Sequence, residues 1–405
     1  MPAGFCPEPA GSVFDAPYRR AMLPATSDFH EGRTPMPFTP DRLRRRIAYG
    51  VGLVLLLTLV VWAGLFVSRA GLLREIRPVR PGPCSMIPGF TGPEDIAIDR
   101  ARAQAFVISA DRYGVFNHGR SPDGDIKLIA LDHPERPPRS LHPLPGIDFF
   151  PHGIDLWIDP DGRRRLFVID HGRDGHRHAV RIFDVAEDGT LTLAETVRGS
   201  ALIDPDDLVA LDARRFYVTN LYGSRGGFGR FVENYLMWPR ADVVFFDGNR
   251  LRRVVDSLAL ANGILLTPDR RHLLVAEVIR NRIRIYRRES DVSLVPEGSI
   301  SLEMGPDNLM MDEGGAIWVA GHPNLLDAAR RMRGEDHPSP SEVVRIEWKP
   351  GAPARVVPVY RDRGDELSMA SVALPWHDTL YIGSVDAPYL LHCSLDGRAP
   401  PSRIR

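Results

Sequence analysis

From about residue 84 to residue 395, short apolar runs alternate with turns rich in Asp, Gly and Pro, and the alternation recurs six times. Each unit begins with one apolar strand pattern, crosses a turn and continues into a second. Two examples are PEDIAIDRARAQAFVIS from Pro93 and PHGIDLWIDPDGRRRLFVID from Pro151. Short apolar runs bounded by turn residues are typical of β-strands. The pattern therefore predicts a chain built mainly from paired strands.

The spacing of these units indicates how the strands are grouped. The later units begin at Pro205, Ala261, Pro306 and Ser368, so that successive starts lie 45 to 62 residues apart. Between units there is room for two further strands, as in KLIALD, VRIFDV and RIRIYRR. Four strands per unit at this spacing are typical of propeller blades. The sequence predicts an all-β fold, a six-bladed β-propeller over residues 84–398.

One segment inside this repeat has helical periodicity. GFGRFVENYLMW, residues 227–238, predicts a short helix inserted between strands. Its apolar Phe228, Phe231, Tyr235 and Leu236 are expected to pack on the core as a cap, with exposure at the propeller top or to a membrane as the alternative. Few other segments are helical in pattern, which argues against a parallel α/β fold.

A different pattern precedes the propeller. Residues 47–67 run for 21 positions without a charge, which is long enough to cross a bilayer. No small-residue cleavage site follows, so we expect an uncleaved transmembrane signal anchor. We expect residues 1–46 to form a disordered cytoplasmic tail, 68–83 a linker and 399–405 a C-terminal tail. Arginines flank the span on both sides, so charge bias alone orients it weakly.

The three cysteines bear on the compartment. Cys84 and Cys393 bracket the predicted propeller, whereas Cys6 lies before the span. A pair at the two ends of a domain suits a disulfide that clasps its termini, and such a bond requires an oxidising compartment. Two unrelated buried thiols are the alternative. With the disulfide, the propeller lies on the extracytoplasmic side, which we expect to be the periplasm.

Charge and composition exclude one class of partner. The formal net charge is −1, and among the basic residues only Lys127 and Lys349 are lysine. A nucleic-acid-binding surface would carry excess positive charge, so we expect no nucleic-acid partner. We attribute the preference for arginine to coding bias.

Polar side chains recur in register at the start of five of the six units. Equivalent positions in successive blades of a propeller surround its central channel, so these side chains are expected to converge. Their carboxylate and amide oxygens suit a hard cation such as Ca²⁺, while the scarcity of cysteine and the single histidine among these positions argue against zinc. The alternative is that Asp and Asn only begin turns. The positions are Glu94–Asp95, His152, Asp206–Asp207, Asn262 and Asp307–Asn308.

Adjacent polar residues suggest more than one ion. Neighbours on an extended strand point in different directions. One member of each pair could therefore serve an upper ion and the other a lower ion, and two stacked ions follow as a hypothesis.

Ordered motifs within the repeat resemble one known family. PEDIAID, PHGI, DDLVAL with FYVTN, ANGI, SLEMGPDN with WVAGHPN, SEVVRI and LHCSL occur in this order in the paraoxonase (arylesterase) family. The resemblance covers roughly residues 80–397, and both Cys84 and Cys393 match the disulfide of that family. It implies a Ca²⁺-dependent hydrolase of lactones and aryl esters, with a small-molecule substrate.

The resemblance also implies roles for individual residues. His152 is similar to the catalytic histidine of the family, His171 to its supporting histidine, and Tyr113 to a tyrosine on the loop that covers the substrate pocket. The implied ligands of the catalytic Ca²⁺ are Glu94, Asp206, Asn262, Asp307 and Asn308. The implied ligands of the structural Ca²⁺ are Asp95, Asp207 and the carbonyl of Ile154. We interpret His322 as a strand-end packing residue.

One implied ligand departs from the family pattern. The family usually has Asn where this chain has Asp206, so three carboxylates would surround a divalent ion and leave a net charge of −1. This should weaken the ion as a Lewis acid. The expected reaction has the ion polarise the substrate carbonyl while His152, supported by His171, activates water.

Two other functions remain open from the sequence. The first is a different enzyme on a similar propeller, such as a gluconolactonase or a strictosidine-synthase-like enzyme. The second is a non-catalytic, Ca²⁺-stabilised propeller that acts as a membrane-tethered binding module. A covalent serine mechanism is disfavoured, because the sequence contains no GxSxG motif.

Overall fold

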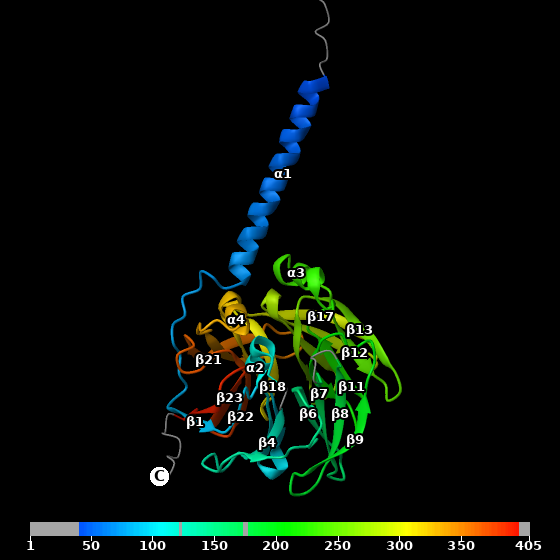
Figure 1. The fold of residues 1–405 in the computed structure, drawn as a ribbon, viewed down its shortest axis with the longest axis vertical. Coiled ribbons are helices and arrows are strands. Elements are labelled where there is room, and N and C mark those ends of the chain that lie inside the picture. The colour runs from blue at the N-terminus through cyan, green and yellow to red at the C-terminus, as the bar shows by residue number, and fades with distance from the viewer. Residues whose placement is uncertain (1–39, 121–123, 173–176, 397–405) are drawn as a thin grey trace, which may run out of the picture. The chain divides into compact units, whose positions relative to one another are not determined.

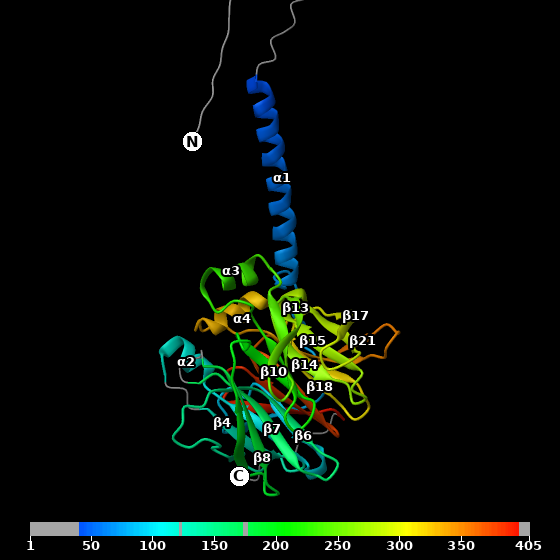
Figure 2. The same ribbon diagram turned by 90° about the vertical axis from the view of Figure 1, so that its right-hand side faces the viewer.

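A computed structural model describes residues 40–120, 124–172 and 177–396 of the protein. Residues 1–39 of the tail predicted at 1–46, the tail predicted at 399–405, and Cys6 lie outside the described residues. The described part holds 24 strands in six four-stranded antiparallel sheets, which confirms the predicted six-bladed propeller. Figures 1 and 2 show the sheets from two directions.

Each sheet is one blade, and its first strand in the following list lies nearest the channel. Blade one has β2 (Ile96–Asp99), β3 (Gln104–Ser109), β4 (Asp125–Ala130) and β5 (Arg139–Ser140). Blade two has β6 (Pro151–Ile158), β7 (Arg164–Asp170), β8 (Ala179–Val185) and β9 (Leu191–Val197). Blade three has β10 (Pro205–Ala210), β11 (Phe216–Asn220), β12 (Ala241–Phe246) and β13 (Leu251–Leu258).

The remaining blades follow the same plan. Blade four has β14 (Ala261–Leu266), β15 (His272–Glu277), β16 (Arg282–Arg288) and β17 (Leu294–Ser301). Blade five has β18 (Gly305–Met311), β19 (Ile317–His322), β20 (Ser341–Glu347) and β21 (Arg355–Asp362). Blade six has β22 (Ala370–Trp376), β23 (Thr379–Ser384), β24 (Tyr389–Ser394) and, as its outer strand, β1 (Cys84–Pro88).

Blade six closes the ring by combining the two ends of the propeller sequence. β1 pairs antiparallel with β24, and in Figure 1 the blue N-terminal strand lies beside the red C-terminal strands. Cys84 and Cys393 are direct partners in this ladder and form a disulfide. The expectation of a bond that clasps the domain termini is therefore confirmed.

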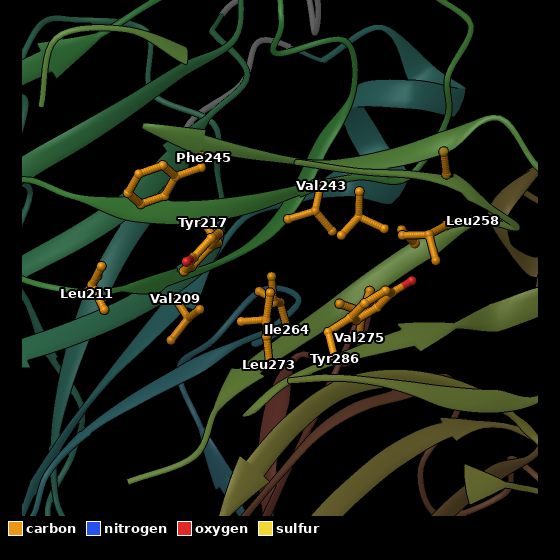
Figure 3. Close-up of a cluster of buried hydrophobic side chains, with 13 residues drawn as sticks. Val209, Leu211, Tyr217, Val243, Phe245, Leu258, Ile264, Leu273, Val275 and Tyr286 are labelled. Atoms are coloured by element: carbon orange, nitrogen blue, oxygen red, sulfur yellow. The ribbon is translucent and has the colours of Figure 1, made fainter. Parts of the chain in front are cut away.

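The hydrophobic core is divided among the contacts between blades. The central strands of each blade are buried on both faces, which explains their continuous apolar runs, such as VVFF in β12 and HLLVA in β15. Six buried clusters each lie between two neighbouring blades. Figure 3 shows the cluster between blades three and four, where Tyr217 and Phe245 face Ile264 and Leu273. Packing sheet on sheet in this way holds the blades around the channel.

A local irregularity in the innermost strands positions the polar residues. In blades two to five, the pairing between the first and second strands is interrupted by a β-bulge, and the polar residues lie in this bulge. In blade two, for example, the bulge lies between Pro151 and Ile154. Such β-bulges redirect side chains. Gly153 and Gly263 permit this arrangement, because a Cβ at either position would lie 2.4–2.5 Å from a backbone oxygen of the next blade.

The N-terminal helix α1 spans Pro40–Arg69, and thus starts before the predicted 47–67 span. Among the described residues, one helix is long and apolar enough to cross a membrane, from Asp41 to Arg69. The chain divides into two compact units between Thr58 and Leu59. The second unit contains the last part of α1 and the propeller.

Three short helices and two 3-10 turns interrupt the strands. They are α2 (Arg112–His118), α3 (Gly227–Tyr235), α4 (Leu325–Met332), η1 (Arg100–Arg102) and η2 (Val278–Arg280). The helix predicted at 227–238 is confirmed as α3, but the expected packing of its apolar side chains was wrong. Phe228 and Phe231 are exposed, and Glu233 is the buried residue of this helix.

The segment between α1 and β1 lies against blade five. Val79 forms an isolated bridge with Arg361, and Arg74 pairs with the buried carboxylate of Glu342 at 2.7 Å. The residues predicted as a linker therefore have fixed contacts with the propeller, within the second unit.

Candidate active site

A cavity of about 790 Å³ opens at the end of the channel where the bulged strands begin. Its floor carries Glu94, His152, Asp206, Asn262 and Asp307, each from a different blade. Its walls are mainly apolar and include Phe66, Phe150, Met237, Leu325 and Met369. The propeller thus brings together predicted residues that are widely separated in sequence.

Five buried oxygens on or directly beside this floor have no hydrogen-bond partner among the described residues. One belongs to each side chain implied to hold the upper ion: Glu94 Oε2, Asp206 Oδ1, Asn262 Oδ1, Asp307 Oδ1 and Asn308 Oδ1. Buried polar atoms are almost always hydrogen-bonded, because an unpaired one costs roughly 1–3 kcal/mol. Five such oxygens from neighbouring blades are therefore the feature expected of a cation site.

Burial disfavours the charged form of two carboxyl groups in this set, Glu94 and Asp206, and raises their pKa values. Burial raises the pKa of Glu94 to about 7, an effect opposed by Arg112 and increased by Asp307. Burial raises the pKa of Asp206 well above its usual range, and the charges of Glu94 and Asp307 raise it further. Each carboxylate would be stabilised by an added positive charge.

The donor set fits a hard cation better than a transition metal. All five unpartnered atoms are oxygens, and two come from amides. Within residues 40–120, 124–172 and 177–396, no group of three or more His, Cys, Asp and Glu side chains is compact enough to form a metal cluster alone. The oxygen-only donor set, which includes two asparagine amides, fits Ca²⁺.

A second acidic layer has a different bonding pattern. Asp95 Oδ2 accepts a hydrogen bond from the Ile154 amide of blade two, and Asp207 Oδ2 accepts one from the Ile264 amide of blade four, both at 2.8 Å. Their second oxygens accept from the amides of Ile96 and Leu208. Both carboxylates therefore brace neighbouring blades and present no unpartnered oxygen to a lower ion.

A pair of histidines borders the floor of the cavity. His152 Nε2 lies 3.6 Å from Glu94 Oε2, and His152 Nδ1 lies 2.8 Å from His171 Nε2. Burial lowers the pKa of His152 well below its usual value, and the charge of Arg112 lowers it further. His152 is therefore held uncharged, as a proton acceptor must be.

Tyr113 was predicted to lie on the loop that covers the pocket, and this stays a prediction; its neighbour Arg112 lines the cavity. The Tyr113 hydroxyl donates to the Gly334 carbonyl at 2.9 Å, and Tyr113 is not among the described residues that line the cavity. Arg112 is buried, lines the cavity and lies 3.8 Å from Glu94 Oε2. Its Nη2 donates to the Pro151 carbonyl at 2.8 Å.

Other residues of the site were not recognised from the sequence. His178 contacts His171, with 2.9 Å between their Nδ1 atoms. His322 ends β19 as expected, but the packing interpretation was incomplete, because it lines the cavity and its Nε2 lies 2.9 Å from Asp307 Oδ2. His322 stands in the WVAGHPN motif, but that motif alone does not assign it to the site, and no motif marks His178; the strand register brings both residues there.

Comparison with known proteins identifies the family. The Arylesterase family model matches residues 75–395, which is nearly the whole propeller. The chain belongs to the arylesterase family. Serum paraoxonase/arylesterase 2 of Gallus gallus is 31% identical over 327 residues, covering 79% of this chain and 91% of that protein. Serum paraoxonase/lactonase 3 of Homo sapiens is 31% identical over 329 residues, with the same two coverages.

Membership of the arylesterase family makes the chain a lactonase- or esterase-type hydrolase. Serum paraoxonase/arylesterase 1 of Homo sapiens is 29% identical over 328 residues, covering 78% of this chain and 90% of that protein. A gluconolactonase structure from Xanthomonas campestris has 18% identity and a TM-score of 0.46, covering 79% of this chain and 98% of that one. At this level of similarity the solved structure adds nothing to the family assignment.

Proposed function

We propose that this arylesterase-family hydrolase cleaves lactones, and aryl esters as a second substrate class, with Ca²⁺ as its resident cofactor. The observation that carries the proposal is the set of five unpartnered oxygens on the cavity floor, beside an uncharged histidine. The names of the relatives, which include arylesterase and lactonase, agree with these substrate classes.

The residues that would hold the ion are Glu94, Asp206, Asn262, Asp307 and Asn308. When bound there, Ca²⁺ would supply Lewis-acid polarisation of an ester carbonyl. A lower ion, expected at Asp95, Asp207 and the Ile154 carbonyl, stays a prediction. Its carboxylate oxygens already accept backbone amides, so the number of ions bound per chain is the test.

His152 is the proposed general base. Its low pKa leaves a nitrogen lone pair at neutral pH, and the Nδ1 contact with His171 leaves Nε2 as the nitrogen that accepts a proton from the attacking water. His171, which is buried, is proposed to hold the ring of His152 in place.

The walls of the cavity suit an apolar substrate group. Aromatic and aliphatic side chains surround the floor, and such walls bury alkyl or aryl groups favourably. The reacting carbonyl would then lie at the polar floor, where His152 and the five oxygens are.

For its location, we propose a single-pass membrane protein with the propeller on the extracytoplasmic side, in the periplasm. The Cys84–Cys393 disulfide supports an oxidising compartment. Exposed aromatic side chains of α3 support contact with the membrane interface, where Trp and Tyr are enriched. In the second unit, Trp62 Nε1 of α1 donates to the Tyr235 carbonyl of α3 at 3.2 Å.

The direct test is hydrolysis of a panel of alkyl lactones, sugar lactones and aryl acetates by the full-length protein in detergent, with Ca²⁺ and with EGTA. We expect Ca²⁺-dependent turnover whose kcat falls about 10²–10⁴-fold in His152→Gln. His133→Gln, at a half-exposed turn residue outside the cavity, is the control and should keep its activity.

Two results would contradict the proposal. A folded, Ca²⁺-loaded protein with no turnover on any of these substrates would favour a binding module. Turnover restricted to sugar lactones would favour the gluconolactonase alternative.

A further inference from the structure

Three histidines lie side by side at one end of blade two. In the ladder of this blade, Pro151 of β6 pairs with Asp170 of β7, and Asp170 pairs with Ala179 of β8. His152 comes directly after Pro151, His171 directly after Asp170, and His178 directly before Ala179. The β7–β8 register therefore sets His171 opposite His178, and the bulge between Pro151 and Ile154 brings the His152 ring beside His171.

The distances between the three rings match the spacing of neighbouring strands in a sheet. The centroids of His152 and His171 are 5.0 Å apart, as are those of His171 and His178. Neighbouring strands lie about 4.8 Å apart, which matches the spacing of the rings. The closest nitrogens are 2.8 Å apart in the first pair and 2.9 Å apart in the second. His171 and His178 are buried, whereas His152 is partly exposed where it lines the cavity.

Hydrogen bonding along the row is directional. A neutral imidazole carries one N–H donor and one acceptor nitrogen. If His152 Nε2 is to accept a proton, the proton of that ring must be on Nδ1, from which it donates to His171 Nε2. His171 then carries its own proton on Nδ1 and must donate it to His178 Nδ1.

A competing tautomer is available to His152. The backbone carbonyl of Pro205 is within hydrogen-bonding reach of this ring. With its proton on Nε2, His152 could donate to that carbonyl and would then have no base facing the cavity. An acceptor at the far end of the row favours the productive arrangement instead.

We propose that His178 is a positioning residue, which accepts a hydrogen bond from His171 Nδ1 and so keeps His152 Nε2 unprotonated and facing the cavity. This inference rests on the proposed function, because it presumes that His152 is the base. His178 itself lies outside the residues that line the cavity. It acts on the reaction only through His171.

A second feature shows that the row is held from the side of His171. The buried carboxylate of Asp170 accepts hydrogen bonds from the amides of Phe150 and Gly172 and pairs with Arg181 at 2.8 Å. These bonds fix the backbone on both sides of the His152–His171 contact. The ring partners of His171 then decide its tautomer, and His178 contacts it at Nδ1.

The test compares two substitutions in the full-length protein. His178→Leu removes the acceptor, whereas His178→Asn places an amide oxygen near the former Nδ1 position. We expect His178→Leu to lower kcat about tenfold to a hundredfold with little change in KM. His178→Asn should recover most of the kcat, provided that its oxygen is the atom that faces His171.

A spectroscopic measurement separates positioning from a purely structural role. In protein labelled with ¹⁵N-histidine, the signals of His171, assigned with His171→Gln, should report the Nδ1–H tautomer in the wild type and in His178→Asn. They should shift towards Nε2–H in His178→Leu. Thermal unfolding should be recorded for every variant.

The outcomes distinguish this proposal from the proposed function. If His178→Leu is folded and retains both the wild-type kcat and the wild-type His171 tautomer, the positioning role is wrong while the hydrolase proposal stands. If His152→Gln is fully active, the assignment of the base fails first. If His178→Leu loses activity and His178→Asn loses it equally with an unchanged tautomer, His178 is structural only.

Discussion

Adjacent acidic residues in the same strand or turn have different roles in this propeller. In blade one, Glu94 leaves an oxygen without a partner on the cavity floor, whereas the next residue, Asp95, is bonded to the backbone of blade two. Blade three repeats the contrast with Asp206 and Asp207. We call the five side chains with such an oxygen the upper ring; its carboxylates are Glu94, Asp206 and Asp307. We call Asp95 and Asp207 the lower ring. One sequence repeat therefore supplies both a candidate ligand site and a set of braces between blades.

The largest expected effect is on stability, in the lower ring. Asp207→Ala would leave the buried amides of Leu208 and Ile264 without their acceptor. At roughly 1–3 kcal/mol for each unsatisfied group, we expect a loss of about 2–6 kcal/mol. Urea unfolding in EGTA measures it, and Asp207→Asn, which keeps one acceptor oxygen, should lose less. A loss that appears only with Ca²⁺ present would instead make Asp207 a ligand.

The next effect concerns pH and the upper ring. The pKa of Glu94 is raised to about 7, so the metal-free folded state binds more protons than the unfolded state between about pH 4.5 and 7. The contribution of Glu94 to the free energy of unfolding therefore decreases as the pH rises through that window, by on the order of a few kcal/mol.

The matched variant for this pH effect is Glu94→Gln. In EGTA its stability should fall less steeply than that of the wild type as the pH rises from about 4.5 to 7. Unfolding curves at several pH values measure the difference. Parallel pH profiles for the two proteins would contradict the electrostatic account of the upper ring.

A smaller effect is expected on cation affinity. Asp206→Asn keeps an oxygen donor but removes one of three carboxylate charges, so Ca²⁺ should bind at least about tenfold more weakly. Calorimetric titration measures the Kd. The metal-free form of this variant should be no less stable than the wild type, because burial disfavours the Asp206 charge. Unchanged affinity would place Asp206 outside the ligand set.

The smallest effect belongs to Arg112. Its buried guanidinium offsets one of the three upper carboxylates, so Arg112→Gln should tighten Ca²⁺ binding a few-fold, by about 1 kcal/mol or less. Combining it with Asp206→Asn restores the net charge, and the double variant should return towards the wild-type Kd. Arg120→Gln, at an exposed position, is the control. Weaker binding in Arg112→Gln would mean that the arginine orders the ligands.

The parts of the molecule that the sequence predicted are those that repeat. The six units indicated the blades, and polar residues in register indicated the channel, because equivalent positions of a propeller meet at its axis. Arg112 had no such signal, since it lies on α2, a short helix between β3 and β4 that is outside the repeated strand pattern. His178 depended on the pairing of β7 with β8, which a single sequence does not specify.

The error at α3 has a similar physical cause. Its periodicity correctly indicated a helix, but an apolar face does not reveal what covers it. The assumption that the core covers it failed for Phe228 and Phe231, which are exposed. Short helices such as α2 and α4 were missed because two turns contain too few residues for a period to be read.

The outer strand of blade six has a consequence for how the chain folds. β1 comes before every other strand of the propeller, yet its partner β24 comes last, with 309 positions separating the two bonded cysteines. Contacts so distant in sequence form late and slow folding. Blades one to five can assemble as synthesis proceeds, but the ring cannot close until Ser394 has been made and delivered to the same compartment. A chain that ended a few residues before Ser394 would leave β1 as an unpaired edge strand, exposed to aggregation and proteolysis.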